Sequence, residues 1–312
     1  MRNQLLLGFM KTHRWLCSSI ILPLLIVAVT PAAALDVMSN HPYLGAIAVD
    51  AVTGDALFED NPDAVGYPAS VVKLMVLLII LEAVEAGHLT LDEPVTVTRT
   101  AAKMGGSQVY LEENEVFPVD ELLYALVVRS ANDAAAALAI HYAGSKEAFI
   151  ELMNGRARDI DMNHTVFHSV HGLPPGRGQL PDISTARDIA ELCRVLVQKP
   201  IVFKYTSTRR RLFRTDADVP FEMVNHNPLL KTVDGCDGLK TGFFYAAGFS
   251  IAATAAKEGK RVIAVVIGAE SQRVRDARAK KILTEGLSTL VTSEPGPTPA
   301  STRSSTPTNK VP

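Results

Sequence analysis

A serine and a lysine stand three residues apart at the start of a long apolar segment. Pro68 opens this segment, Ser70 and Lys73 follow, and the residues from Val71 to Ile80 are otherwise nearly all apolar. A helix here would place Ser70 and Lys73 on one face, with the serine at the positive end of the helix dipole. A neutral amine at that position can take the hydroxyl proton, and burial or a second nearby cation favours the neutral form. The alternative, a helix cap followed by a surface lysine, fits poorly because an exposed position is improbable inside an apolar run.

A second polar element, Ser130-Ala131-Asn132, interrupts what would otherwise be a continuous helix from Asp120 to Tyr142. Short polar side chains favour such breaks because they form hydrogen bonds with the local backbone. Taken alone, this element predicts only a turn between two helices.

A third element, Lys240-Thr241-Gly242, lies within a predicted strand over residues 237–245. A lysine and a hydroxyl beside a glycine suit an anionic ligand that lies against the backbone. By composition, this tripeptide is the most specific of the three elements.

Ser-x-x-Lys, Ser-x-Asn and Lys-Thr-Gly in this order are the motifs of penicillin-binding proteins and class A β-lactamases. The chain resembles the low-molecular-mass penicillin-binding proteins, which are serine D-alanyl-D-alanine carboxypeptidases. The resemblance runs from about residue 40 to 290. Further similar segments lie at 104–107, 130–135, 171–173, 184–188 and 240–243.

The resemblance implies a reaction on peptidoglycan stem peptides and a role for each catalytic residue. Ser70 would attack the carbonyl between the two terminal D-alanines, Lys73 would act as general base, and Ser130 would relay a proton to the leaving amine. β-Lactams would then be covalent inhibitors on Ser70.

The same resemblance implies a substrate-binding set. Asn132 would hold the peptide backbone, and Lys240 and Thr241, followed by Gly242, would bind the terminal carboxylate. The backbone N–H groups of Ser70 and Phe243 would form the oxyanion hole. Relatives often carry histidine or tyrosine at position 243, and we expect phenylalanine there to alter the fit of the substrate rather than the oxyanion hole.

Strands from both ends of the sequence and helices between them must position these residues. The expected strands flank a glycine-containing turn at 53–55 and recur in three segments near the C-terminus; they lie at 43–49, 56–59, 238–245, 248–255 and 261–268. Helical spacing occurs at 69–86, 120–128, 133–142, 185–198 and 272–290. The predicted class is α+β: a largely antiparallel sheet of the β-lactamase and D,D-peptidase type, flanked by helices, with a mostly helical lobe.

The two ends of the chain are expected to lie outside the fold. Residues 1–34 combine a basic start, an apolar run at 20–29 and the sequence Ala32-Ala33-Ala34, a pattern typical of a secretory signal peptide cleaved after Ala34. An uncleaved membrane anchor is the alternative, and membrane contact is expected only in that case. Residues 293–312 are rich in proline, serine and threonine and are predicted to be a disordered tail. The catalytic domain would span residues 35–292, exported to the periplasm or another extracytoplasmic wall space.

Composition excludes several classes of protein. Lysine and arginine number 31 against 33 acidic residues, with no sustained basic run, so nucleic-acid binding is not expected. The chain has three cysteines. Cys193 and Cys236, the two in the core, are expected to be free and buried, with a disulfide as the alternative. His164, His168 and His171 lack the H-E-x-x-H pattern and a convincing carboxylate ligand. We therefore expect neither a metal nor a cofactor.

Other functions stay open from the sequence alone. One is D,D-endopeptidase activity on wall cross-links, and another is a non-catalytic domain that binds the wall or β-lactams. The intact serine and lysine set argues against the latter, because a pure binder needs no activated nucleophile. A class A β-lactamase would need a glutamate in an E-x-x-L-N segment, and none occurs between Ser130 and Lys240.

Overall fold

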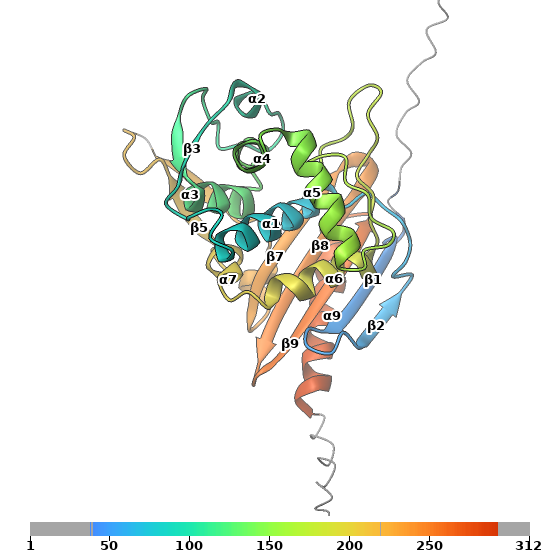
Figure 1. The fold of residues 1–312 in the computed structure, drawn as a ribbon. Coiled ribbons are helices and arrows are strands. Elements are labelled where there is room, and N and C mark those ends of the chain that lie inside the picture. Colours follow the sequence, from blue (N-terminus) through green and yellow to red (C-terminus); the bar gives the residue numbers. More distant parts are fainter. Residues whose placement is uncertain (1–37, 39, 219, 293–312) are drawn as a thin grey trace, which may run out of the picture. The chain divides into compact units, whose positions relative to one another are not determined.

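The computed structural model describes residues 38, 40–218 and 220–292 (Figure 1). These residues make up nearly all of the predicted catalytic domain. The predicted signal peptide at 1–34 and the predicted tail at 293–312 lie outside the described residues.

The centre of the fold is a five-stranded antiparallel sheet, in which strands from the two ends of the chain are neighbours. In spatial order the strands are β2 (Ala56–Asp60), β1 (Gly45–Asp50), β9 (Lys260–Ala269), β8 (Gly248–Lys257) and β7 (Cys236–Phe244). β1 and β9 pair with Ile47 opposite Val265. The antiparallel sheet and the helices around it confirm the predicted α+β class.

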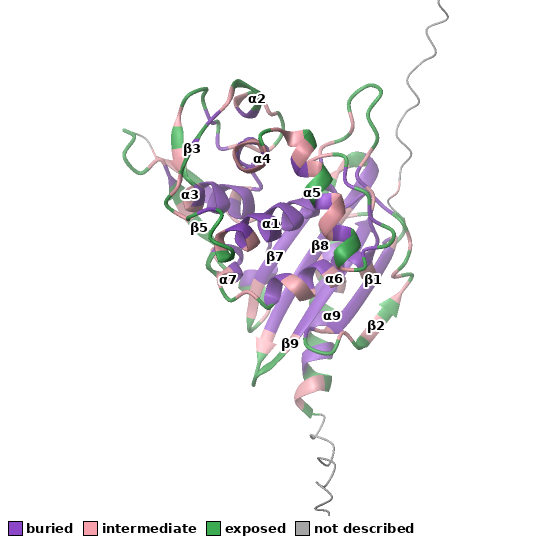
Figure 2. Cartoon of the chain, viewed as in Figure 1, coloured by how far each residue is buried: buried purple, intermediate pink, exposed green. Residues whose placement is uncertain are grey.

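Helices cover both faces of this sheet (Figures 1 and 2). The last helix, α9 (Gln272–Thr292), packs on one face, and α6 (Ala186–Val197) with α1 (Lys73–Glu85) packs on the other. Successive side chains of a strand point to opposite faces, so Ile263 joins the core below α1 and α6, whereas Val262 joins the core below α9. The central strands are therefore apolar almost throughout their length.

A mostly helical lobe stands beside the sheet and supplies one of the three predicted site elements, Ser130-Ala131-Asn132. Its helices, which include a π-helical turn η2, are α2 (Arg99–Ala102), α3 (Val119–Tyr124), η2 (Ala125–Arg129), α4 (Asn132–Ala143), α5 (Lys146–Asp159) and α7 (Val202–Thr206). The short helix α8 (Leu229–Thr232) packs against β7 instead, and its Leu229 joins the core below α9. Two short ribbons complete the lobe, β3 (Pro94–Thr96) with β4 (Val116–Pro118), and β5 (Arg210–Phe213) with β6 (Phe221–Val224).

The predicted hairpin, the three C-terminal strands and the five predicted helices are present within a few residues of the expected bounds. The first predicted helix begins as a 3-10 turn, η1 (Ala69–Val72), before α1 continues. The sequence pattern does not reveal α5, because only Phe149, Met153 and Ala157 of its residues are buried and most of the others are polar. Cys193 and Cys236 are both free, but only Cys193 is buried.

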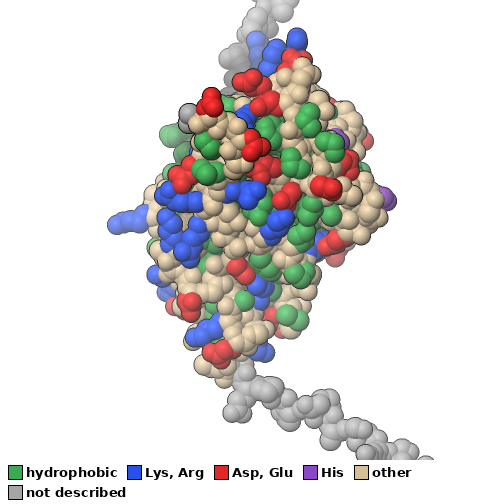
Figure 3. All heavy atoms as spheres, turned by 90° about the vertical axis from the view of Figure 1, so that its left-hand side faces the viewer, with side chains coloured by type: hydrophobic (Ala, Val, Ile, Leu, Met, Phe, Trp, Pro, Cys, Tyr) green, Lys and Arg blue, Asp and Glu red, His purple; other side chains and the backbone are tan. Residues whose placement is uncertain are grey.

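Figure 3 shows the face on which β5 lies, where basic side chains are interspersed with acidic ones. Three arginines near β5 are paired with glutamates: Arg210 with Glu222 at 2.9 Å, Arg211 with Glu121 at 2.6 Å and Arg214 with Glu115 at 2.6 Å. Their charges are largely neutralised by these neighbours.

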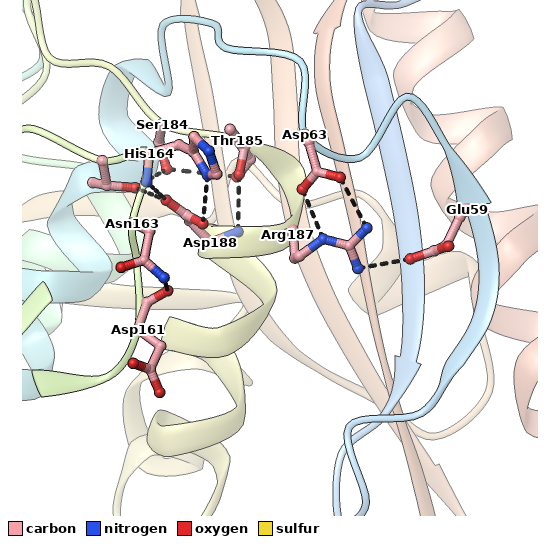
Figure 4. A network of polar contacts seen from close by, with 10 residues as sticks. Glu59, Asp63, Asp161, Asn163, His164, Ser184, Thr185, Arg187 and Asp188 are labelled. Carbon is pink, nitrogen blue, oxygen red and sulfur yellow. Dashed lines mark hydrogen bonds and ion pairs between the residues drawn. The ribbon is translucent and has the colours of Figure 1, made fainter. Parts of the chain in front are cut away.

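The first turn of α6 forms hydrogen bonds with residues 164–165 on one side and with the region of β2 on the other (Figure 4). Thr185 caps the helix by accepting a hydrogen bond from the Asp188 N–H at 3.1 Å. The buried Asp188 carboxylate accepts from the His164 N–H at 2.8 Å and from the Thr165 hydroxyl at 2.7 Å. The half-buried Arg187, next to it, reaches the region of β2 instead, pairing with Asp63 and Glu59.

We predict that Asp188→Ala lowers the free energy of unfolding by about 2–4 kcal/mol, because two donors lose a charged acceptor in a buried place. The matched control is Glu147→Ala, which removes an exposed carboxylate from the first turn of α5 and should cost less than about 1 kcal/mol. Urea titrations followed by circular dichroism measure both. Equal losses in the two variants would contradict the structural role of Asp188.

Candidate active site

Ser70 and Lys73 are in contact, as the sequence predicts. The Lys73 Nζ lies 2.9 Å from the Ser70 Oγ, and both residues belong to the turn from η1 into α1. Ala69, directly before the serine, is buried and has a φ of 49°. A non-glycine residue in this region is strained, and such strain is often found at functional sites.

The backbone of a distant turn provides the second contact of Lys73. The His171 carbonyl oxygen accepts a hydrogen bond from Nζ at 2.6 Å. Gly172 follows with a φ of 75°, and a Cβ there would lie 2.0 Å from the Ala69 carbonyl oxygen. Only glycine allows the turn to pack this closely against the residue before Ser70.

Asp182 holds that turn in place. Its buried carboxylate accepts hydrogen bonds from the His168 N–H at 2.6 Å, the Ser169 N–H at 2.8 Å and the Ser169 hydroxyl at 2.6 Å. The Ser169 hydroxyl oxygen in turn accepts from the Gly172 N–H at 2.8 Å. The acid thus positions the carbonyl that contacts Lys73 without touching the lysine side chain itself.

Burial and a neighbouring cation act together on Lys73. The side chain is 1% exposed. Burial, followed by the charge of Lys240, lowers the pKa of Lys73 well below the ordinary lysine value, and the more distant charges of Asp182 and Asp133 offset this only in part. The neutral amine that a general base requires is therefore favoured.

Ser130 and Asn132 lie at the break between η2 and α4, as predicted. Ser130 ends η2 with a φ of 61° and is buried. The Asn132 amide donates to the Gly105 carbonyl at 2.7 Å, while its Oδ1 atom is buried and has no hydrogen-bond partner within the described residues. A buried carbonyl oxygen of this kind is expected to accept a hydrogen bond from a ligand or a water molecule.

Asp133 fixes the loop opposite this break. Its buried carboxylate accepts from the backbone N–H groups of Val109 at 3.1 Å, Leu111 at 3.0 Å and Ala134 at 2.9 Å. In the same loop, the Ser107 hydroxyl donates to the Arg129 carbonyl at 2.7 Å. Buried charge-assisted hydrogen bonds therefore hold this side of the site.

β7, the edge strand of the sheet, forms the other side. A Cβ on Gly242 would lie 2.5 Å from the Pro68 carbonyl oxygen and 3.0 Å from the Ser70 nitrogen. The glycine therefore allows the strand to approach the backbone of η1 closely, and Phe243, whose N–H is the second predicted oxyanion donor, follows it directly. The buried Lys240 amine donates to the Thr241 carbonyl at 2.9 Å.

A pocket of about 420 Å³ opens between these elements. Five of the predicted residues line it: Ser70, Ser130, Thr241, Gly242 and Phe243. Lys73, Asn132 and Lys240 do not line it; they are 1–3% exposed and lie behind its wall. Five further lining residues are not predicted by the sequence motifs, namely Ser107, His226, Phe249, Gln272 and Arg275. Of these, Ser107 lies within the similar segment at 104–107, the one signal in the sequence that points to any of them.

Two of the unpredicted residues add to the electrostatics of the pocket. Burial, reinforced by the charge of Arg275, lowers the pKa of Lys240 to about 7. Burial and then Lys240 lower the pKa of His226 to about 4, with smaller contributions from other cations that include Arg129 and Arg275. Basic groups thus gather around the pocket, and an anionic ligand there would favour their protonated forms.

Across the described ranges, no three histidine, cysteine or acidic side chains gather in a way that could hold a metal ion. The helices described in the structure also include none with the length and apolar character needed to cross a bilayer.

Comparison with known proteins places the chain in a family. The model of the D-alanyl-D-alanine carboxypeptidase family, peptidase S11, matches residues 30–271. The chain belongs to this family. The chain is 35% identical over 243 residues to the D-alanyl-D-alanine carboxypeptidase DacF of Bacillus subtilis, covering 78% of this chain and 61% of that protein. It is 32% identical to a D-alanyl-D-alanine endopeptidase of Escherichia coli, covering 83% of this chain and 81% of that protein.

Solved structures of family members share the fold. The D-alanyl-D-alanine carboxypeptidase DacD from Francisella tularensis aligns with a TM-score of 0.73 at 29% identity, over 83% of this chain and 73% of that one. Penicillin-binding protein D2 from Listeria monocytogenes, in its ampicillin-bound form, aligns with a TM-score of 0.69 at 30% identity, over 81% of this chain and 98% of that one. The chain spans only 60–63% of the length of three curated carboxypeptidases that it matches.

We predict that Lys240→Met stabilises the protein most at pH 7 and below. Lys240 has a pKa of about 7 when folded and an ordinary value of 10.5 otherwise. Between these values the unfolded chain holds a proton that the folded chain lacks, so wild-type stability rises with pH through this window. The variant should therefore have a higher free energy of unfolding than wild type, by on the order of a few kcal/mol at pH 6, and this difference should shrink toward pH 10.

Urea unfolding at a series of pH values tests this expectation. Lys231→Met is the matched control, since Lys231 is exposed and has no buried charge to relieve. If the free energies of unfolding of Lys240→Met and wild type differ by the same amount at every pH, Lys240 is not held neutral by its surroundings.

Proposed function

We propose that this protein is a serine D-alanyl-D-alanine carboxypeptidase that removes the terminal D-alanine from peptidoglycan stem peptides. The observation that carries the proposal is the buried Lys73 amine, hydrogen-bonded to the Ser70 hydroxyl at the edge of a pocket surrounded by further cations. A serine activated by a neutral amine performs acyl transfer, and the cations suit a substrate with a free carboxylate.

Acylation depends on the contacts of Lys73. Its lone pair takes the Ser70 proton while the oxygen forms a bond to the carbonyl carbon of the penultimate D-alanine. The His171 carbonyl holds the amine in position at 2.6 Å. The backbone N–H groups of Ser70 and of Phe243, the residue after Gly242, stabilise the oxyanion.

Collapse of this intermediate breaks the carbon–nitrogen bond and releases D-alanine. The leaving nitrogen needs a proton, which Lys73 gives back through the Ser130 hydroxyl. Ser130 lines the same pocket as Ser70, so its hydroxyl belongs to the wall that a bound peptide would contact. A water molecule then attacks the ester, with Lys73 again taking the proton, and frees the shortened peptide.

Recognition of a free C-terminus rests on Lys240, Thr241 and Arg275. Thr241 and Arg275 line the pocket, and Lys240 lies directly behind it. A carboxylate here would interact with two cations and a hydroxyl, whereas an amide would leave the cations uncompensated. Asn132, with its unpartnered Oδ1 atom, would accept a hydrogen bond from an N–H group of the peptide.

β-Lactams are proposed as covalent inhibitors of the same serine. Their ring carbonyl would acylate Ser70, and the leaving group would stay tethered in the pocket. Listeria penicillin-binding protein D2, to which this chain is similar, has a solved ampicillin-bound form. Without an E-x-x-L-N glutamate between Ser130 and Lys240, release of the adduct would be slow.

D,D-Endopeptidase activity on cross-linked peptides is the second candidate. It is favoured by one observation: the chain is 32% identical over 263 residues to the D-alanyl-D-alanine endopeptidase of E. coli. The two reactions share the nucleophile and differ in the group attached beyond the scissile bond.

We also propose that residues 1–34 are a signal peptide, that residues 35–292 are the catalytic domain, and that the enzyme acts outside the cytoplasm. The wall-directed activities in the names of its relatives support this place of action. Residues 293–312 are proposed as a tail without a catalytic role.

The main test is release of D-alanine from a stem pentapeptide by the purified protein. Wild type should release it and should form a stable adduct with labelled penicillin, whereas Ser70→Ala should do neither. Lys73→Ala should slow acylation by about 10²- to 10⁴-fold, the usual contribution of a general base. Turnover of many penicillin molecules per second would contradict the carboxypeptidase assignment. Cleavage of cross-linked dimers alone would favour the endopeptidase.

Lys240→Ala should act on recognition of the carboxylate. We expect it to lower kcat/KM by about 10- to 100-fold for a peptide acid, from about 1.5–3 kcal/mol for a charge-assisted contact, and much less for the peptide amide. In wild type, KM for the acid should rise above pH 7, because the Lys240 pKa of about 7 leaves the amine neutral there. If the ratio of kcat/KM for the peptide acid to kcat/KM for the peptide amide is the same in the variant and in wild type, Lys240 does not bind the carboxylate.

A further inference from the structure

Two phenylalanine rings form one wall of the pocket. Phe243 in β7 lies opposite Phe249 in β8, and their rings stack with centroids 4.1 Å apart and planes 23° apart. Both residues line the pocket, and Phe243 is 53% exposed. A half-exposed aromatic ring beside the nucleophile leaves apolar area available to a ligand.

The alternation of β7 places this wall on a definite side of the strand. A Cβ on Gly242 would point at the Pro68 carbonyl, and Phe244 stacks on Tyr67, so these two positions face η1. Thr241 and Phe243 point to the opposite side. The pocket thus extends from Ser70 over the edge of the sheet to the Phe243 ring.

The wall also adjoins the cationic end of the pocket. The Arg275 guanidinium lies 6.0 Å from the centre of the Phe249 ring, and Gln272 and Arg275 of α9 line the pocket beside it. A substrate whose carbonyl is at Ser70 and whose carboxylate is near Thr241 and Arg275 must pass its last residue between these points. The two rings belong to the wall of the pocket that the side chain of that residue can contact.

We propose that the stacked Phe243 and Phe249 rings select the side chain of the residue that leaves, favouring a small apolar D-amino acid over glycine or a polar residue. This inference rests on the proposed carboxypeptidase activity and adds a specificity determinant to it. It assigns a function to the Phe243 side chain that is separate from the function of its backbone N–H. Apolar contact with the rings stabilises a methyl group and gives nothing to a hydrogen atom.

The experiment measures kcat/KM for three peptides that differ only in the last residue, D-alanine, glycine or D-serine. For wild type we expect the order D-alanine, then D-serine and glycine. Phe243→Ala should lower the ratio of D-alanine to glycine by about fourfold, the effect of one buried methyl group. Phe249→Leu, which keeps an apolar side chain but removes the stack, should lower it by less.

Tyr245→Ala is the matched control. Tyr245 lies two residues beyond Phe243, is 85% exposed and is not among the residues that line the pocket. Its removal should leave the ratio as in wild type. Because each ratio is taken within one preparation, partial loss of folded enzyme cancels.

The outcomes separate this inference from the proposed function. Release of D-alanine by wild type with an unchanged ratio in Phe243→Ala overturns the inference alone, as would an equal fall in Tyr245→Ala. A wild type that cleaves none of the three peptides overturns both.

Discussion

The structure depends on the burial of an amine without a carboxylate in contact with it. Lys73 is 1% exposed at the start of a helix whose next eight residues are all buried and apolar. An ammonium ion there would carry a large desolvation cost, so the group tends to give up its proton instead. In an ordinary core a buried amine only lowers stability, whereas here its neutral form can accept the proton of Ser70.

Several segments converge around that amine, and their backbones are either in an unusual conformation or packed unusually close together. Ala69 and Ser130 both have positive φ values, and glycines at 172 and 242 pack where a Cβ would overlap a neighbouring backbone. Two buried acids, Asp133 and Asp182, receive hydrogen bonds from the loops on either side. Lys73 donates instead to the Ser70 hydroxyl and the His171 carbonyl. The charges of the two acids offset part of the fall in the pKa of Lys73. The acids therefore organise the backbone of the site rather than its proton transfers.

The parts of the site that could be predicted are those with local signals in the sequence. Ser70, Lys73 and the break at Ser130 show their spacing within a few residues, and alternation or helical periodicity locates most elements of the sheet and core. Phe249, His226 and Arg275 could not be found in this way. They come from β8, from the turn after β6 and from α9, and only the packing of the sheet edge brings them to one pocket. The polar helix α5 and the short ribbons escape prediction because few of their residues are buried.

The pairing of β1 with β9 has a consequence for the order in which the chain folds. Gly45 lies opposite Ile267, so the first strand has no neighbour on that side until nearly the whole domain has been synthesised. Contacts between such distant residues form late, because closing a long loop costs entropy before any contact forms. The helical segments in between can form first, while the sheet stays incomplete. Because β9 is the middle strand of the sheet, we expect a chain that ends before residue 260 to keep its helical segments but to leave β1 and β8 without their shared neighbour.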